Sequence, residues 1–149
     1  MDDRTRWLQN ELKLSQLDPT VRQAFEDVCK AMEVRGWKVH VVETKRSKLR
    51  QAWLLVRGYS RTWNSKHLTG RAMDVIDARW EWKLTPVEFQ ADLFILALRQ
   101  GLTTGVLFGL NTSEKHNRTF YAMNGNRTEL VPLLTAKRGW DGCHCSDGG

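Results

Sequence analysis

Cysteine and proline are scarce in this 149-residue chain, with three of each. The cysteines are Cys29, Cys143 and Cys145, and an odd number with two of them only one residue apart does not make a disulfide framework. The longest uncharged apolar run, around residues 93–98, is far short of the roughly 20 residues that a membrane span needs. The first residues do not form a Sec-type signal peptide. We therefore expect a reduced protein that is made in the cytoplasm and has no membrane span.

The composition is that of an ordinary globular protein with a basic balance. Hydrophobic residues make up 41% of the chain and charged residues 27%, which is too apolar for a disordered protein. The length fits a single domain over residues 1–149, without a separate binding domain. There are 23 Lys and Arg against 17 Asp and Glu, so the formal net charge is +6. This excess suggests an anionic partner without saying which one.

Hydrophobic periodicity and turn residues predict an alternation of helices and strands. Thr85 and Glu88, with Pro86 between them, form a Thr-x-x-Glu pattern that is typical of a helix start. The segment 111–127 is polar and contains Asn-Gly at 124–125, which indicates a turn or hairpin. The predicted helices cover residues 4–16, 21–35, 47–57 and 86–100, and the predicted strands cover residues 37–42, 71–78, 105–110 and 140–146. We expect one α+β domain in which helices pack on a small, largely antiparallel sheet.

Residues 65–74 carry the pattern that is most informative about chemistry. His67 lies in a predicted loop, and Asp74 shares one face of a predicted strand with the apolar Ala72. A carboxylate among apolar neighbours is costly unless it is paired or binds a metal. Gly70 lets the backbone turn between the two residues, so that His67 and Asp74 can converge. A His and an Asp are two of the three protein ligands of a catalytic zinc site whose fourth position holds water.

A third ligand and a base are expected near the end of the sequence. Asp141 and His144 are three residues apart around Gly142, so both side chains can reach one ion. One of them would bind the ion, and the other would take a proton from its water. We therefore predict a single catalytic zinc ion (Zn²⁺) held by His67, Asp74 and His144, with Asp141 as the general base.

Other residues compete for these roles. His116 lies in the polar 111–127 segment without an adjacent acid, and His40 alternates with valines on a predicted strand. Asp147 is an alternative base, but its place beside the final glycines suggests a frayed end. Cys143 and Cys145 flank His144 and could indicate a structural zinc site, but such a site needs a second pair of ligands. If His144 faces a metal on a strand, both cysteines point away from it.

The pattern Ser65-x-His67-x-x-Gly70-x-Ala72-x-Asp74 resembles the signature of the LAS metallopeptidases. That superfamily includes D-alanyl-D-alanine carboxypeptidases, phage endolysins and hedgehog-type relatives. The sequence from 65 to 74 looks most like the L-alanyl-D-glutamate peptidases among the endolysins. The element from Asp141 to His144 is similar to the one that closes their site, and residues 43–47 with Gln51 are similar to their Thr-x-Arg-Ser segment. The resemblance implies the fold of the hedgehog and D-alanyl-D-alanine peptidases, and it implies that Arg46 steadies the substrate carbonyl or the oxyanion.

The resemblance also implies a function, that of a zinc peptidase which hydrolyses the stem peptide of bacterial peptidoglycan at the L-Ala–D-Glu bond. Zinc would lower the pKa of a bound water, so that a hydroxide is available at neutral pH. Asp141 would take the proton of this water and later pass it to the leaving amine. Ser65, Trp63 and Trp140 are expected to contact substrate, since they lie in or beside the predicted site elements. A phage endolysin of this kind would stay in the host cytoplasm, as a monomer, until another protein opens the membrane. Its basic surface would then approach the anionic cell envelope.

Two other functions remain compatible with the sequence. A D-alanyl-D-alanine carboxypeptidase would use the same chemistry, but it must clamp a terminal carboxylate, and Arg46 alone does not decide that. A non-enzymatic wall- or nucleic-acid-binding module would use the basic cluster over residues 35–61. No helix-turn-helix, zinc-finger or aromatic-stacking signature accompanies this cluster, so we expect no nucleic-acid partner.

Overall fold

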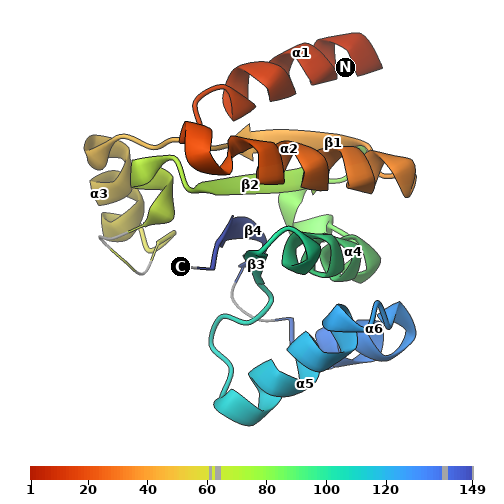
Figure 1. Ribbon diagram of the computed structural model, residues 1–149. Coiled ribbons are helices and arrows are strands. Elements are labelled where there is room, and N and C mark those ends of the chain that lie inside the picture. The colour runs from red at the N-terminus through yellow and green to blue at the C-terminus, as the bar shows by residue number, and fades with distance from the viewer. Residues whose placement is uncertain (61, 63–64, 139–140, 149) are drawn as a thin grey trace.

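The computed structural model describes residues 1–60, 62, 65–138 and 141–148 (Figure 1). Its helices are α1 (Asp3–Leu14), α2 (Pro19–Val34), α3 (Lys48–Val56), α4 (Val87–Arg99), α5 (Thr112–Met123) and α6 (Arg127–Ala136), with short 3₁₀ helices η1 (Lys66–Thr69) and η2 (Trp82–Leu84). Its strands are β1 (Val39–Glu43), β2 (Ala72–Asp77), β3 (Leu102–Gly105) and β4 (Asp141–Asp147). In Figure 1, α1 lies above the sheet, and α5 and α6 lie below it.

The four strands form an antiparallel sheet in the order β1-β2-β4-β3. The central strands are therefore β2 and β4, although α4, β3, α5 and α6 lie between them in the sequence. Pairing of these two strands brings residues near 74 beside residues near 144. The architecture confirms the expected α+β domain with helices packed on a small antiparallel sheet.

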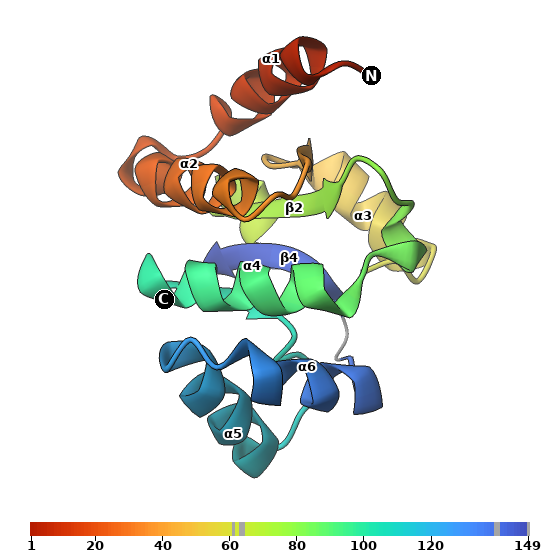
Figure 2. The same cartoon turned by 90° about the vertical axis from the view of Figure 1, so that its right-hand side faces the viewer.

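One face of the sheet is covered by α2 and α4. Both helices lie on the near side of β2 and β4 in Figure 2. Met73 and Val75 of β2 and Cys145 of β4 pack against Phe25 of α2 and Phe89 of α4 in the main hydrophobic core. Because successive side chains of a strand point to opposite faces, Asp74 and His144 must face the other side. The apolar alternation of β2 thus determines which face is left for a site.

The helix α4 lies between two hydrophobic clusters. Phe89 and Leu93 face the main core, whereas Phe94 and Ile95 pack with Leu130 and other residues of α5 and α6. A helix that is apolar all round is expected where both of its sides are covered. The continuous apolar run near residues 93–98 is therefore explained by burial of α4 inside the protein. None of the described helices is long and apolar enough to cross a membrane.

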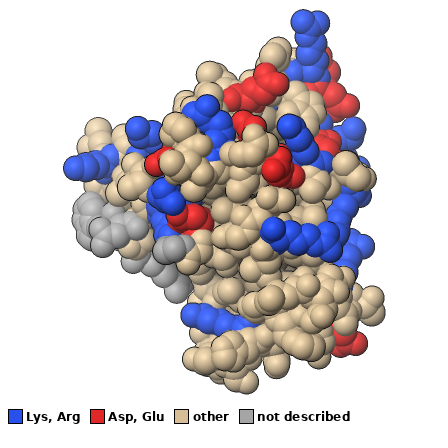
Figure 3. All heavy atoms as spheres, in the orientation of Figure 1, with Lys and Arg blue, Asp and Glu red and all other residues tan. Residues whose placement is uncertain are grey.

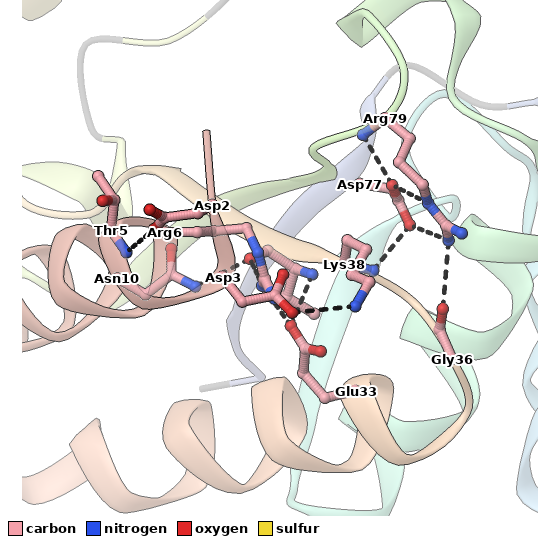
Figure 4. A network of polar contacts seen from close by, with 11 residues as sticks. Asp2, Asp3, Thr5, Arg6, Asn10, Glu33, Gly36, Lys38, Asp77 and Arg79 are labelled. Atoms are coloured by element: carbon pink, nitrogen blue, oxygen red, sulfur yellow. Dashed lines mark hydrogen bonds and ion pairs between the residues drawn. The ribbon is translucent and has the colours of Figure 1, made fainter.

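The edge strand β1 is covered by polar side chains of α1 (Figure 4). The amide of Asn10 donates to the carbonyl of Val39 at 2.8 Å and accepts from the backbone N–H of Val41 at 2.8 Å, as a neighbouring strand would. The buried Arg6 donates to the carbonyl of Val39 and to Glu33 of α2. These bonds satisfy backbone groups that would otherwise form an open sheet edge.

The segment between α4 and β4 differs from the prediction. The strand expected over 105–110 is wrong, because Gly101, at a φ of 74°, ends the preceding helical turn and β3 starts at once at Leu102. Val106 and Leu110 are buried, and Val106 packs in the cluster beneath α4, so their apolar character reflects packing rather than strand pairing. Residues 106–109 form a turn instead.

The hairpin considered for residues 111–127 is also wrong, because this segment forms α5 and the start of α6. Asn111 and Glu114 make the reciprocal hydrogen bonds of a capping box, which starts α5. The Asn-Gly turn does occur, with Gly125 at a φ of 65°, but it joins two helices. At Thr85 the expected capping box does not form, since its hydroxyl donates to the carbonyl of Trp82.

Candidate active site

The central pair of strands brings two of the predicted ligands side by side. Asp74 of β2 is paired directly with His144 of β4, and on its other side it is paired with Glu43 of β1. Directly opposed residues in an antiparallel sheet have Cβ atoms about 4.5–5.5 Å apart. The carboxylate of Asp74 is therefore held between neighbours on both adjacent strands.

The third predicted ligand, His67, comes from η1. Ser65 caps this short helix by accepting from the backbone N–H of His67 at 3.2 Å, and Gly70, at a φ of 69°, ends it in the left-handed conformation. The backbone N–H of Arg46 donates to the carbonyl of His67 at 2.8 Å, which ties η1 to the loop after β1. Ser65 and Gly70 of the motif thus position the His67 side chain.

The nitrogen and oxygen atoms of the three side chains converge. The Nε2 atom of His67 lies 3.1 Å from Oδ2 of Asp74, and Nδ1 of His144 lies 3.1 Å from Oδ1 of Asp74. One donor atom from each residue can be chosen so that all three lie within 4.8 Å of one another. The two imidazole rings meet edge to face at a centroid distance of 5.1 Å. These are the atoms that a divalent cation would require at one point.

The hydrogen bonds around His67 leave one nitrogen available. Its Nδ1 atom lies 2.6 Å from the carbonyl oxygen of Thr44. A carbonyl can only accept, so Nδ1 carries the hydrogen and Nε2 presents its lone pair to the site. This Nε2 atom is buried and has no hydrogen-bond partner among the described residues. A carbonyl behind a ligating imidazole is the usual arrangement at zinc sites.

These observations fit a zinc ion. Two imidazoles and one carboxylate form a typical zinc donor set, and ligand atoms about 2.0–2.1 Å from a tetrahedral ion lie about 3.3 Å apart. The 3.1 Å separations that involve Asp74 are close to this value. A buried imidazole nitrogen without a partner would otherwise cost free energy. The described residues His67, Asp74 and His144 could therefore hold one zinc ion.

The electrostatics of the site separate its two aspartates. Burial alone would raise the pKa of Asp74, but the adjacent imidazoles of His144 and His67 outweigh it and hold that pKa well below its usual range. The pKa of His67 is raised, because the carboxylate of Asp74 outweighs the effect of burial. Burial and the negative charge of Asp74 raise the pKa of Asp141 to about 6. Asp74 is thus a fixed anion, whereas Asp141 can change its protonation near neutral pH.

Asp141 is the first residue of β4 and lies against β3. Its partner across the sheet is Gly105, at an irregularity in the register, and a Cβ atom on Gly105 would lie 1.6 Å from the carbonyl oxygen of Asp141. The side chain lines the same cleft as the three ligands, and its Oδ1 atom is buried without a hydrogen-bond partner among the described residues. Asp141 therefore presents an unpaired carboxylate oxygen in the site.

Arg46 reaches the site but is already held by other side chains. It makes two bonds to Glu43, at 2.9 and 2.8 Å, and one to Gln51 at 2.6 Å. Its Nη2 atom lies 3.6 Å from Oδ2 of Asp74. The guanidinium is thus a fixed positive charge beside the predicted metal ligands.

The predicted site residues that the structure describes line one cleft of about 1150 Å³. Its described lining includes the expected residues Arg46, Ser65, His67, Asp74, Asp141 and His144. Trp63 and Trp140 lie outside the described residues, so their contact with substrate stays a prediction. The roles assigned to the described residues also stay predictions, although the geometry brings them together.

The end of β4 is well anchored rather than frayed. The carboxylate of Asp147 pairs with Lys66 of η1 and with Arg71, and its backbone N–H donates to the carbonyl of Arg71. These contacts tie the strand that carries His144 to the helix that carries His67. Because its oxygens are engaged by two cations, Asp147 is poorly suited to be the base that was considered as an alternative to Asp141.

The competing residues lie elsewhere or face away. His116 is exposed on α5, and His40 on β1 is paired with Ile76. Cys143 and Cys145 are free and buried, with Cys145 in the main core, as the strand alternation predicts.

Two contributors to the site could not be predicted from the sequence. The carbonyl of Thr44 orients His67, and a carbonyl leaves no trace in the residue type. Phe108 packs against the ring of His144 at a centroid distance of 5.5 Å. It lies in the segment that was wrongly expected to be a strand, so its position could not be derived.

Comparisons with known proteins support the fold. No family model and no curated protein matches the chain. Among solved structures, the chain is similar to the crystal structure of the L-Ala D-Glu endopeptidase ChiX of Serratia marcescens. The TM-score is 0.53 at 22% sequence identity, and the alignment covers 93% of this chain and 85% of that chain. The chain therefore shares the fold of an L-Ala D-Glu endopeptidase, as the sequence resemblance implies.

Proposed function

We propose that this chain is a zinc-dependent peptidase that hydrolyses the stem peptide of peptidoglycan. One observation carries the proposal: donor atoms of His67, Asp74 and His144 converge within 4.8 Å in a cleft that also contains the unpaired carboxylate oxygen of Asp141. A three-ligand group beside an acid with a pKa near neutrality is the arrangement of hydrolytic zinc sites. The LAS-type motif and the fold shared with ChiX support peptidoglycan as the substrate.

Asp141 and Arg46 have different roles in the proposed reaction. When bound, a zinc ion supplies a Lewis acid and lowers the pKa of a coordinated water. Asp141, with a pKa of about 6, accepts a proton at neutral pH and returns it to the leaving amine. Glu43 and Gln51 hold the Arg46 side chain in place. Its positive charge stabilises the negative charge that develops on the substrate carbonyl oxygen.

The bond we propose is that between L-Ala and D-Glu, which is supported by the motif and by the endopeptidase activity for which ChiX is named. Purified peptidoglycan sacculi digested with the zinc-loaded chain and analysed by mass spectrometry test this proposal. Fragments with a new amino-terminal D-Glu are expected. Release of terminal D-Ala alone would identify a D-alanyl-D-alanine carboxypeptidase instead, and no released fragment would contradict the hydrolase proposal.

The biological setting is a separate proposal. We propose that the enzyme acts as a phage lysin, which reaches the wall from the host cytoplasm once the membrane is opened. Expression in a bacterium with and without a membrane-permeabilising agent tests this point. Lysis only after permeabilisation is expected, and no lysis of permeabilised cells would overturn it.

A further inference from the structure

The positive charge of the chain is concentrated around α3. Residues 44–73 contain eight of the 23 Lys and Arg and none of the 17 Asp and Glu, although the whole chain has a net charge of only +6. The remaining residues are therefore slightly acidic as a group. In Figure 3, Lys and Arg atoms lie at the left-hand edge of the molecule, where α3 lies in Figure 1, as well as along the top and the right-hand side. The charge that suggests an anionic partner thus belongs to one region.

The outward face of α3 is apolar. Leu49, Trp53 and Val56 follow one another at the i, i+4 and i+7 spacing, so they form a stripe along one side of the helix. Leu49 is 83% exposed, Val56 82% and Trp53 47%. The opposite side buries Gln51 and Leu54. A stripe of this kind is normally buried, so its exposure on a nine-residue helix indicates a contact surface.

The stripe is extended and flanked by further residues. Tyr59 is 70% exposed and stacks on Trp53 at a centroid distance of 6.0 Å. The guanidinium groups of Arg50 and Arg57 each lie 5.5 Å from the centre of the Trp53 ring. Both groups therefore lie beside the apolar stripe.

Some of the surrounding cations have no acidic partner. Arg46 is paired with Glu43, and Arg50 lies 3.5 Å from the same carboxylate. Lys45, Lys48 and Arg57 are exposed and form no ion pair with any described residue. Their charges are available to an external anion.

We propose that the outer face of α3 docks on a bilayer surface that contains anionic phospholipid. This α3 surface consists of the stripe Leu49, Trp53, Val56 and Tyr59 with the flanking Lys45, Lys48, Arg50 and Arg57. Apolar side chains at helical spacing enter the boundary between headgroups and acyl chains, while basic side chains bind lipid phosphates. A polyanion such as a wall polymer or a nucleic acid would use the charges but not the exposed aliphatic residues.

The α3 surface is continuous with the cleft. The cleft that contains His67, Asp74 and His144 is also lined by Leu54, Gly58, Tyr59 and Ser60. A chain docked through α3 would therefore have the rim of its cleft beside the bilayer. Docking is a property of this surface alone, so it does not depend on the proposed hydrolase activity.

Cosedimentation of the full chain with lipid vesicles tests the proposal. We expect binding to vesicles of phosphatidylglycerol mixed with phosphatidylcholine and much weaker binding to pure phosphatidylcholine. The double variant Leu49→Ser/Val56→Ser should bind at least about tenfold more weakly, and Lys45→Gln or Lys48→Gln about fivefold more weakly each. Binding should also shift the fluorescence of the wild-type protein to shorter wavelength, and Trp53→Phe should reduce that shift.

A matched control uses the same chemistry at another surface. Leu8 and Leu12 are exposed on α1, so Leu8→Ser/Leu12→Ser should leave vesicle binding unchanged. Absence of binding to the anionic vesicles would overturn the proposal, as would binding that Leu49→Ser/Val56→Ser does not weaken. Equal affinity for polyphosphate without lipid would assign the surface to a polyanion and would also overturn it. The vesicles contain no peptidoglycan, so these outcomes are separate from those of the hydrolase test.

Discussion

A backbone carbonyl and a neighbouring carboxylate determine the chemical state of the two ionisable groups that matter most. The carbonyl of Thr44 accepts from Nδ1 of His67, which leaves Nε2 as a ligand atom. Burial, together with the charge of Asp74, raises the pKa of Asp141 to about 6. The motif spacing could predict His67 and Asp74 as a pair, because the residues themselves carry that information. The tautomer of His67 could not be predicted, because it depends on a main-chain atom of a distant segment.

The division of roles between ligand and base predicts different defects in two variants. Asp141→Asn should lower kcat by about 10²–10⁴ while one zinc ion per chain remains bound, because a general base is lost and the ligands are intact. His67→Ala should lose both zinc and activity. Metal analysis of the purified variants and their rates on sacculi measure these effects. Loss of zinc from Asp141→Asn would show that Asp141 is a ligand.

The raised pKa of Asp141 predicts an acid limit to activity. The base works only when it is deprotonated, so kcat/KM should fall as the pH drops below about 6, by about tenfold per pH unit. A bound cation favours the carboxylate, so the limit lies at or below this pH. The pH profile should be recorded with the zinc content measured at each point. Unchanged kcat/KM at pH 4 with zinc retained would contradict the assignment.

At the scale of elements, the contact of β3 with β4 places Asp141. Gly105 lies so close to the start of β4 that no side chain fits between the two backbones. This close approach is not visible in the sequence, where Gly105 reads as the start of a strand. The helices α5 and α6 were missed for a related reason, since their polar residues and the Asn-Gly turn also fit a hairpin. Tertiary packing determined the structure at Gly105, whereas the local capping box of Asn111 and Glu114 starts α5.

Gly105→Ala should therefore displace the start of β4. A Cβ atom 1.6 Å from the carbonyl oxygen of Asp141 meets backbone that cannot rotate away. We expect the free energy of unfolding to fall by at least about 2 kcal/mol, with loss of activity. Gly148→Ala is a matched control, because its nearest contact would be an ordinary 3.6 Å and it should change stability by less than about 0.5 kcal/mol. Urea unfolding of both variants provides the comparison, and equal stability would refute the close approach.

The ion pairs of Asp147 join β4 to η1, and they predict a pH-dependent contribution to stability. Lys66 and Arg71 outweigh burial and lower the pKa of Asp147, so its contribution is present above the unfolded pKa near 3.8 and is lost as the pH falls below it. Asp147→Asn should lower the free energy of unfolding at pH 7 by about 1–2 kcal/mol. The surface variant Glu114→Gln, which weakens an exposed pair with Lys137, should lower it much less. If both variants unfold at the same urea concentration, Asp147 has no special role.

For the whole molecule, the sheet separates a covered face from a face that holds the site. The ligands come from η1, β2 and β4, and the pairing of β2 with β4 brings Asp74 and His144 together. The α+β class, the strands 71–78 and 140–146 and the convergence of His67, Asp74 and His144 could be predicted, because alternation and motif spacing are local properties. The cleft could not be predicted, because it is lined by segments that are distant in the sequence. The unpaired cations at α3 could not be predicted either, because the fold decides which basic residues have an acidic partner.

Hydrolysis of peptidoglycan by this chain should require one zinc ion, which His67, Asp74 and His144 would hold. The most direct measurement removes all metal from the full chain, adds zinc in steps, and records the new amino groups released from purified sacculi. We predict no release without metal, then a linear rise to a plateau at one equivalent of zinc per chain, with no rise for His67→Ala. Release by the metal-free chain, or release that a chelator leaves unchanged, would contradict it.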